Sequence, residues 1–440
     1  MRMTRHWFGL ALIVCLHTPA SAEGLAINPA IGTLVTISDG DFDASSYYSG
    51  LLAPREAGHE DLLSVIRFSD DGYSISRLPV SNSVTASPEV LALSRDGSTA
   101  FVVERLGQRG PGMTRVAELP PGRMLTAIDL SDPSQPRQAD SIALEASPEA
   151  LALHPAGDRI AVVSNTPTAS TIQVVSYADG HFTEPARFDV AELGIHGDAD
   201  QPRGGVTLSN IHWHPSGRAL AVNVNTQDRV AFFTVTEGEH GIELHTWGEP
   251  VAVGRDPFVG RFSPDGRFYL TSDWGRDLTA TSLEGRIPDQ ASSISVIRLA
   301  EAGDRHQRIA SVATAPNAEG LAISPDGRLV ATVNMQGTVF APDSPRFQRD
   351  ASVTLLRFDP TSGELEKLAD YPFEGVLPEG GSFSPDGRHF FATVFQGHAD
   401  EPPNAGLEVF RIDDDQRPAL QRIGRIPLPH GVHHVEAGAR

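Results

Sequence analysis

The chain has 440 residues, of which 40% are hydrophobic and 21% charged, so it can bury a substantial core. Its 41 glycines and 33 prolines favour many tight turns and short strands over long helices. The formal net charge of -21 argues against a nucleic-acid partner, because phosphate would be repelled, and no apolar run beyond the N-terminus is long enough to span a bilayer. A neutral, cationic or metal ligand is the expected kind of partner.

The first 22 residues have the layout of a cleaved secretory signal. A short basic stretch precedes an apolar run over residues 7–16, and residues 19–22 read Pro-Ala-Ser-Ala. We therefore predict cleavage after Ala22, a mature domain of residues 23–440 and a periplasmic or secreted location. Cys15 is the one cysteine of the chain, so the mature protein would contain no disulfide, thiol nucleophile or thiolate metal site.

The remainder of the chain repeats one phrase. Residues 320–327 read Gly-Leu-Ala-Ile-Ser-Pro-Asp-Gly, and related phrases stand at 90–97, 150–157, 211–217, 259–266 and 380–387, with a weaker copy at 24–29. The proline of this phrase, or its substitute, falls at residues 29, 95, 155, 215, 264, 325 and 385, which makes seven units of about 60 residues. No boundary between units resembles an inter-domain linker.

Each unit has the pattern of four short strands. In the sixth unit we expect strands over residues 321–323, 329–333, 352–358 and 364–369, with the first two joined by a Pro-Asp-Gly turn. Four antiparallel strands per repeat in a ring predict an all-β, seven-bladed β-propeller that forms a single domain. The start of the repeated phrase occurs both at residues 24–27 and at residues 429–436. Either segment could therefore supply the strand that completes the first blade and closes the ring.

The second strand of several units ends in a phrase such as Val162-Val-Ser-Asn165 or Ala331-Thr-Val-Asn334. With the Ser-Pro-Asp-Gly turn, this resembles the Tyr-Val-Thr-Asn (YVTN) repeats of WD40-like propellers and the related seven-bladed lactonase-like family. The resemblance covers essentially the whole mature chain. It implies the propeller fold, and it implies activities that range from lactone hydrolysis and lactonisation to binding alone, so the function has to be argued from the site.

The loops between the second and third strands are long and irregular, and they lie at about residues 40–61, 104–123, 274–292, 336–350 and 396–404. In a propeller these loops open on the same face as the segments that lead into each first strand. Binding groups concentrate on loops held by a rigid scaffold. We therefore expect the functional surface on this face.

A glutamate repeatedly leads into the first strand, as Glu89, Glu149, Glu319 and Glu379, with Glu23 in register. Other units place Ser209, Phe258 and His430 at this position, which should surround the mouth of the central channel. Several carboxylates close to one axis would repel one another, so we expect either a hard cation such as Ca²⁺ or raised glutamate pKa values there. The alternative is that each glutamate caps backbone amides in its own loop.

Two histidines, His212 and His214, flank Trp213 in the first strand of the fourth unit, and alternation places both opposite Trp213. The segment resembles the His-x-His…Pro-Asp-Gly segment of lactonase-like propellers, whose His, Arg and Glu set lies in the channel mouth. The resemblance carries over to His212 and to His214, with Glu149 or Glu379 as the acid, while Arg261 is placed by register as an oxyanion partner. The sequence departs from the family pattern at residues 224–226, which read Val-Asn-Thr.

The chain ends with His430-Gly-Val-His433-His434-Val-Glu436. On a strand His434 and Glu436 share one face and His433 takes the other, so a single tetrahedral metal site could not use them all. Structural side chains, channel lining through His430 and His433, and a metal site remain alternatives.

Two functional hypotheses follow. The first is an exported, monomeric propeller that binds a small molecule or a protein through the loop-rich face, with Glu89, Glu319, Glu379, His214, His430 and His433 as ligand contacts. The alternative is a lactonase-like hydrolase or lyase in which His212 or a glutamate activates water and Arg261 stabilises the developing negative charge.

Overall fold

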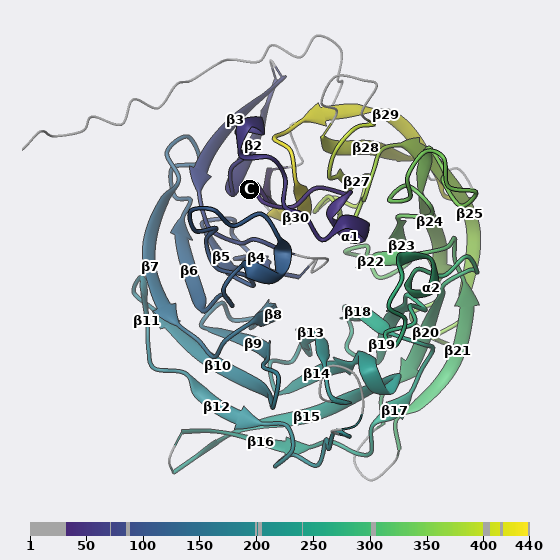
Figure 1. Cartoon of the computed structure of the whole chain (residues 1–440). Helices are drawn as coiled ribbons and strands as arrows, with labels where there is room; N and C mark the ends of the chain where they lie inside the picture. Colours follow the sequence, from purple (N-terminus) through teal and green to yellow (C-terminus); the bar gives the residue numbers. More distant parts are fainter. Residues whose placement is uncertain are drawn as a thin grey trace, which may run out of the picture.

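Strands in seven sheets surround a central axis, so the predicted all-β, seven-bladed propeller is confirmed (Figure 1). The computed structural model describes residues 32–70, 72–84, 89–198, 200, 205–239, 241–300, 305–398, 405–413 and 417–438. The predicted signal peptide, the predicted mouth residue Glu23 and the segment at residues 24–27 lie outside the described residues. In the described part of the chain, no helix is long and apolar enough to cross a membrane.

Every blade is an antiparallel sheet that extends from an inner strand near the axis to an outer strand. From the inside outwards, blade 1 contains β30 (Val432–Gly438), β1 (Thr33–Ser38), β2 (Leu62–Ser69) and β3 (Gly72–Pro79). Blade 2 contains β4 (Leu91–Leu93), β5 (Thr99–Val103), β6 (Met124–Asp129) and β7 (Arg137–Ala143). Blade 3 contains β8 (Pro148–Leu153), β9 (Arg159–Asn165), β10 (Ser170–Ala178) and an interrupted outer strand formed by β11 (His181–Phe182) and β12 (Ala186–Asp189).

The outer strand of blade 4 is interrupted in the same way. Blade 4 contains β13 (Leu208–Trp213), β14 (Ala219–Val224), β15 (Arg229–Gly238), and then β16 (Gly241–Thr246) and β17 (Val251–Ala252). Blade 5 contains β18 (Pro257–Phe262), β19 (Phe268–Asp273), β20 (Ser293–Arg298) and β21 (Gln307–Ala313). Blade 6 contains β22 (Ala318–Ile323), β23 (Leu329–Asn334), β24 (Asp350–Phe358) and β25 (Leu365–Glu374), and blade 7 contains β26 (Gly381–Phe383), β27 (His389–Val394), β28 (Gly406–Asp413) and β29 (Ala419–Pro427).

The turn between the first two strands holds its shape through its own side chains. In blade 6 the Ser324 hydroxyl donates to Asp326 Oδ1 (2.6 Å), and the Arg328 amide donates to the same oxygen (3.1 Å). Gly327 closes the turn at φ +72°, a conformation that favours glycine. Ser263 with Asp265, and Ser384 with Asp386, repeat the serine–aspartate hydrogen bond in blades 5 and 7. The repeated phrase is therefore a hairpin turn between two core strands.

The C-terminal segment closes the ring. β1 pairs with β2 on one side and with β30 on the other, with Val35 opposite Glu436. β30 is thus the inner strand of blade 1, and it packs between the inner strands β26 and β4 of the neighbouring blades. The C-terminal segment predicted at residues 429–436 therefore supplies the strand that closes the ring.

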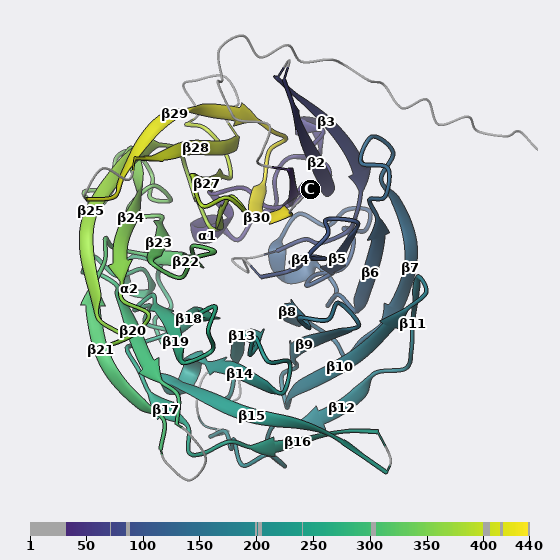
Figure 2. The same ribbon diagram turned by 180° about the vertical axis from the view of Figure 1, so that it is seen from behind.

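The long loops and two short helices gather on one face. α1 (Ser46–Ser49) and α2 (Leu283–Arg286) lie toward the viewer in Figure 1 and away from the viewer in Figure 2. The 3-10 turns η2 (Arg55–Ala57), η3 (Val116–Glu118) and η5 (Asn225–Gln227) belong to the loops between second and third strands. We call this the loop face, and the opposite one, which carries the Pro-Asp-Gly turns, the turn face.

Candidate functional site

The start of each inner strand places one side chain at the channel mouth. In β8, β22 and β30 the register shifts by one residue there, and the bulge contains Glu149, Glu319 and His433, respectively. We call this residue the mouth position. In blade 1 the mouth position is occupied by His433, whereas the register of the repeated phrase predicted His430. The difference arises because β30 begins only at Val432 and its bulge falls on the next residue.

Two of the four predicted mouth glutamates form ion pairs with arginines. Glu149 Oε2 lies 3.0 Å from Arg105 Nε, and Glu89 Oε1 lies 2.8 Å from Arg261 Nη2. The second pair joins the inner regions of blades 2 and 5, which are three blades apart around the ring. The charges of Glu89 and Glu149 are therefore already compensated within the protein.

His212 lies beside this second pair. Its ring Nδ1 is 3.1 Å from the carbonyl oxygen of Trp213. Burial, with a further contribution from the charge of Arg261, lowers the pKa of His212 to about 4, although Glu89 acts in the opposite direction. The imidazole is consequently neutral at neutral pH. His212, Arg261 and Glu89 come together in the channel, whereas Glu149 is engaged with Arg105 instead.

Two further predicted histidines, His214 and His430, have structural partners. His214 follows the end of β13, where its Nε2 lies 2.9 Å from the carbonyl oxygen of Gly266 in the turn of blade 5. It therefore lies at the turn face, away from the channel mouth. His430 Nε2 lies 2.9 Å from the carbonyl oxygen of Phe42, and its ring stacks on His59 at 3.8 Å between centroids. Both contacts hold the first long loop against the body of the propeller.

A second group of mouth residues has no ion-pair partner of opposite fixed charge. Glu319 and Glu379 are fully buried, and none of their four carboxylate oxygens has a hydrogen-bond partner among the residues that the structure describes. Burial raises the pKa of Glu319 to about 8. Burial, and then the charges of Glu319 and Asp39, raise the pKa of Glu379 well above its ordinary value. The sequence prediction of raised glutamate pKa values is thus supported for these two positions.

Tyr47, which sequence analysis missed, lies close enough to this group to interact with the charges of Glu319 and Glu379. It belongs to α1, and its hydroxyl oxygen is buried without a hydrogen-bond partner. Burial and the charges of Glu319 and Glu379 raise its pKa. In both views α1 lies beside the inner ends of β22, β27 and β30 (Figures 1 and 2). Tyr47 lies in a loop outside the repeated phrase, so no repeat pattern could have identified it.

The inner strands of blades 6, 7 and 1 approach one another closely at the mouth position. A Cβ atom added to Gly320 would lie 2.4 Å from the carbonyl oxygen of Glu379, and one added to Gly380 would lie 2.7 Å from that of His433. These glycines directly follow Glu319 and Glu379. Their lack of a side chain permits the approach that gathers Glu319, Glu379 and His433 on one side of the mouth.

The predicted hard-cation site does not exist as a complete cage of protein ligands. Within the described residues, no group of three or more His, Cys, Asp and Glu side chains is arranged to hold a metal ion. A cation at the mouth would therefore depend on fewer carboxylates, together with water or other oxygen ligands.

Two adjoining pockets open on the loop face between blades 4 and 5. The smaller has a volume of about 150 Å³ and is lined by Asn225, Asp256 and Arg276, among others. The larger has a volume of about 360 Å³ and is lined mainly by polar residues of the loop that contains α2. Arg255 and Asp277 line both pockets. None of the predicted site residues lines either one.

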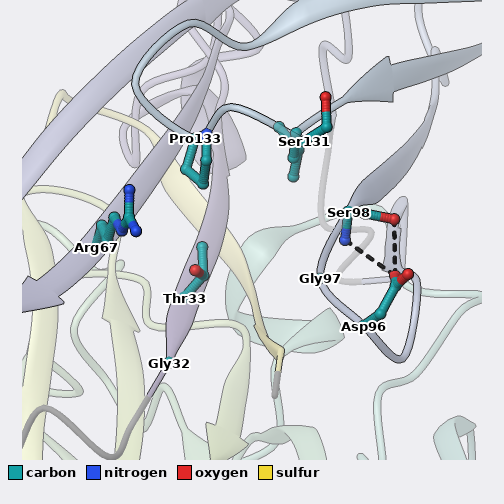
Figure 3. A pocket seen from close by; sticks show the side chains of 9 residues that line it. Gly32, Thr33, Arg67, Asp96, Gly97, Ser98, Ser131 and Pro133 are labelled. Carbon is teal, nitrogen blue, oxygen red and sulfur yellow. Dashed lines mark hydrogen bonds between the residues drawn. The ribbon is translucent and has the colours of Figure 1, made fainter. Parts of the chain in front are cut away.

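A further pocket of about 270 Å³ lies on the turn face between blades 1 and 2 (Figure 3). Asp96 lines it, but its carboxylate accepts hydrogen bonds from the Ser98 amide and hydroxyl within the turn. The polar groups of this pocket that Figure 3 joins by hydrogen bonds thus serve the repeated turn.

Comparison with known proteins identifies the fold more strongly than the activity. No protein-family model matches the chain, and no curated protein matches it. Among solved structures, a periplasmic gluconolactonase from Pseudomonas aeruginosa is 20% identical, with 92% of this chain and 99% of that chain covered and a TM-score of 0.61. A proposed 6-phosphogluconolactonase from Bacteroides uniformis is 14% identical, with 92% and 98% covered and a TM-score of 0.62. The chain is therefore a seven-bladed β-propeller with the fold of lactonase-like propellers.

Proposed function

We propose that this protein is an exported propeller that binds a small hydroxylated anion, such as a sugar acid, in the larger loop-face pocket beside blade 5. The net charge of -21 led us to expect a neutral, cationic or metal ligand, and the observation that favours an anion at this particular site is a pair of arginines in that pocket. Arg255 and Arg286 line it and are exposed, and their guanidinium groups make no ion pair or hydrogen bond among the described residues. Arginine binds carboxylates and phosphates through paired N–H donors.

Two aspartates that line the same pocket already accept hydrogen bonds from the protein. Asp273 accepts hydrogen bonds from the Ser295 hydroxyl (2.6 Å) and from the Gly254 amide (3.1 Å). Asp277 accepts one from the Thr279 amide (3.0 Å). Asp289 also lines the pocket and is exposed. The charge of Arg255 also acts on Asp277 and Asp228. A pocket lined by both arginine and aspartate side chains favours a ligand that has one anionic group for the arginines and several hydroxyl groups for the aspartates.

The size and position of the pocket support binding as well. A volume of about 360 Å³ lies within the range of small-molecule sites, and the pocket is formed by irregular loops on a rigid scaffold. The predicted catalytic residues His212, Glu149 and Arg261 give weaker support for a functional site. Arg261 is paired with Glu89, and Glu149 is paired with Arg105, so neither arginine nor glutamate is free to act on a substrate.

The test is a binding panel of gluconate, glucono-1,5-lactone, citrate and phosphate, measured by calorimetry on the purified protein. At least one anion should bind, and the double variant Arg255→Ala/Arg286→Ala should weaken it at least tenfold. Arg308→Ala, which removes an exposed arginine from β21, is the matched control and should bind as the wild type does. Equal affinity of the double variant and the wild type would refute the proposal.

Lactone hydrolysis is the second candidate, because His212, Arg261 and Glu89 meet in the channel and a structural neighbour is described as a gluconolactonase. Turnover of glucono-1,5-lactone in a pH-stat would decide between the candidates. Hydrolysis that His212→Ala abolishes and Arg255→Ala/Arg286→Ala leaves intact would establish the enzyme and exclude the loop-face pocket as its site.

A further inference from the structure

The mouth glutamates differ in one physical respect. Glu89 and Glu149 each have an arginine at 3.0 Å or less, whereas the four carboxylate oxygens of Glu319 and Glu379 have no hydrogen-bond partner in the described part of the chain. Both of these side chains are 0% exposed. Buried carboxylates without partners are strongly unfavourable, so such a site must take up protons or a cation.

The arginines near Glu319 and Glu379 form ion pairs with other carboxylates. Arg276 Nε lies 2.6 Å from Asp256 Oδ2, and Arg105 is paired with Glu149. Asp39, which also acts on Glu379, accepts hydrogen bonds from the amides of Asp41 and Val84. Without a cation, burial favours the protonated form of both carboxyl groups. If both ionise, they place two negative charges between blades 6 and 7, which one divalent cation can balance.

The buried ring nitrogen Nδ1 of His433 faces the carboxylate of Glu379. The Asn82 amide nitrogen donates to the carbonyl oxygens of Ser38 and Val80, both at 3.0 Å, which fixes the orientation of that amide. Asn82 Oδ1 therefore accepts the proton of His433 Nε2, 3.1 Å away. In the neutral ring, Nδ1 then carries a lone pair, and it lies 3.9 Å from Glu379 Oε2 without a hydrogen-bond partner. Two acceptors that face each other require a proton or a cation between them.

The buried Tyr47 hydroxyl is the second unpartnered group. Its ring packs edge-on against Phe42 at 5.4 Å, so α1 is held over the mouth by apolar contacts. The hydroxyl can supply an additional oxygen ligand and is shielded from solvent. This combination of carboxylates and a further oxygen is the kind of ligand set that Ca²⁺ and Mg²⁺ prefer.

From these contacts we propose that Glu319 and Glu379 bind one divalent cation at the channel mouth beneath α1, with the Tyr47 hydroxyl and water completing the shell. Because the side chains do not form a three-ligand cage as they stand, the two carboxylates are the principal ligands. This site lies apart from the pocket proposed for the anion, so either proposal can fail without the other.

The experiment uses the full mature chain, stripped of metal with a chelator and then titrated separately with Ca²⁺, Mg²⁺ and Mn²⁺ in a calorimeter. One ion should bind per chain and raise the melting temperature. Glu319→Gln and Glu379→Gln should each weaken the tightest ion at least tenfold, and Tyr47→Phe severalfold. Glu192→Gln, an exposed carboxylate on blade 3, is the control and should leave affinity unchanged.

A second measurement separates lost binding from lost folding. In chelator, Glu319→Gln and Glu379→Gln should melt at or above the temperature of the wild type, because glutamine brings no ionisable group into the buried site, whereas the metal-free wild type must either take up protons there or bear the repulsion between two carboxylates. The proposal is overturned if none of the three ions binds the wild type at millimolar concentration, or if both variants bind as tightly as the wild type.

Discussion

At the scale of single residues, equivalent positions have different electrostatic surroundings. Glu89 and Glu149 are paired with arginines, while Glu319 and Glu379 are buried without partners. The partner of Glu89 is Arg261, which stands 172 positions away in the sequence. The repeat identified each glutamate, but the side chain opposite it comes from another blade and follows no repeat.

The buried pair predicts an unusual dependence of stability on pH. Because burial raises the pKa of Glu319 from 4.5 to about 8, the folded chain retains a proton there that the unfolded chain releases above pH 4.5. The free energy of unfolding should therefore decrease as the pH rises from about 4.5 to about 8, by at most about 1.4 kcal/mol per pH unit from this group.

Urea unfolding of metal-free protein at pH 5, 6, 7 and 8 measures this slope. Glu319→Gln should lose much of the decrease, since glutamine does not titrate, whereas Glu192→Gln should retain it. Parallel curves for the wild type and Glu319→Gln would show that Glu319 titrates normally in the folded state.

At the scale of elements, the strands and turns follow the sequence closely. In blade 6 the expected strands at 321–323, 329–333, 352–358 and 364–369 correspond to β22, β23, β24 and β25. Local alternation and Pro-Asp-Gly turn chemistry act within a few residues, so they are readable without tertiary information. The bulge in β30 could not be predicted from the sequence. Because of this bulge, His433 occupies the mouth position in place of His430.

Ring closure predicts that β30 is indispensable. Truncation after Pro427 would leave β1 without its inner partner and remove the packing between β26 and β4. We expect the melting temperature to fall by at least about 10 °C, or cooperative unfolding to be lost. Thermal unfolding followed by circular dichroism measures this, with truncation after Gly438 as the control. A truncated chain that melts as the control does would contradict closure through β30.

At the scale of the whole molecule, the ring separates two faces that differ in structure. The irregular loops, α1, α2 and the two adjoining pockets lie on the loop face, while the repeated turns lie on the opposite one. Long loops tolerate variation because the blades beneath them are held by their own cores. This arrangement supports the expectation that ligands are bound on the loop face.

Export is a property of the whole chain and has its own test. Expression in a bacterium with an intact secretion system should yield protein in the periplasm or medium whose mass begins at Glu23, because the first 22 residues have the pattern of a cleaved signal. Intact-mass spectrometry of the purified protein checks this. A chain that retains Met1 and stays in the cytoplasm would rule out the predicted cleavage.

The amino-acid sequence alone specified the number of blades, the four-strand repeat, the positions of the turns and the face that carries the long loops. It also identified Glu319 and Glu379 as mouth residues. The folded arrangement was needed to learn that Arg261 pairs with Glu89, that Glu149 pairs with Arg105, and that the buried Tyr47 hydroxyl interacts with the charges of the remaining two glutamates. The physical reason is range: strand alternation and turn preference act between neighbours in the chain, whereas charge compensation and burial depend on side chains from distant blades.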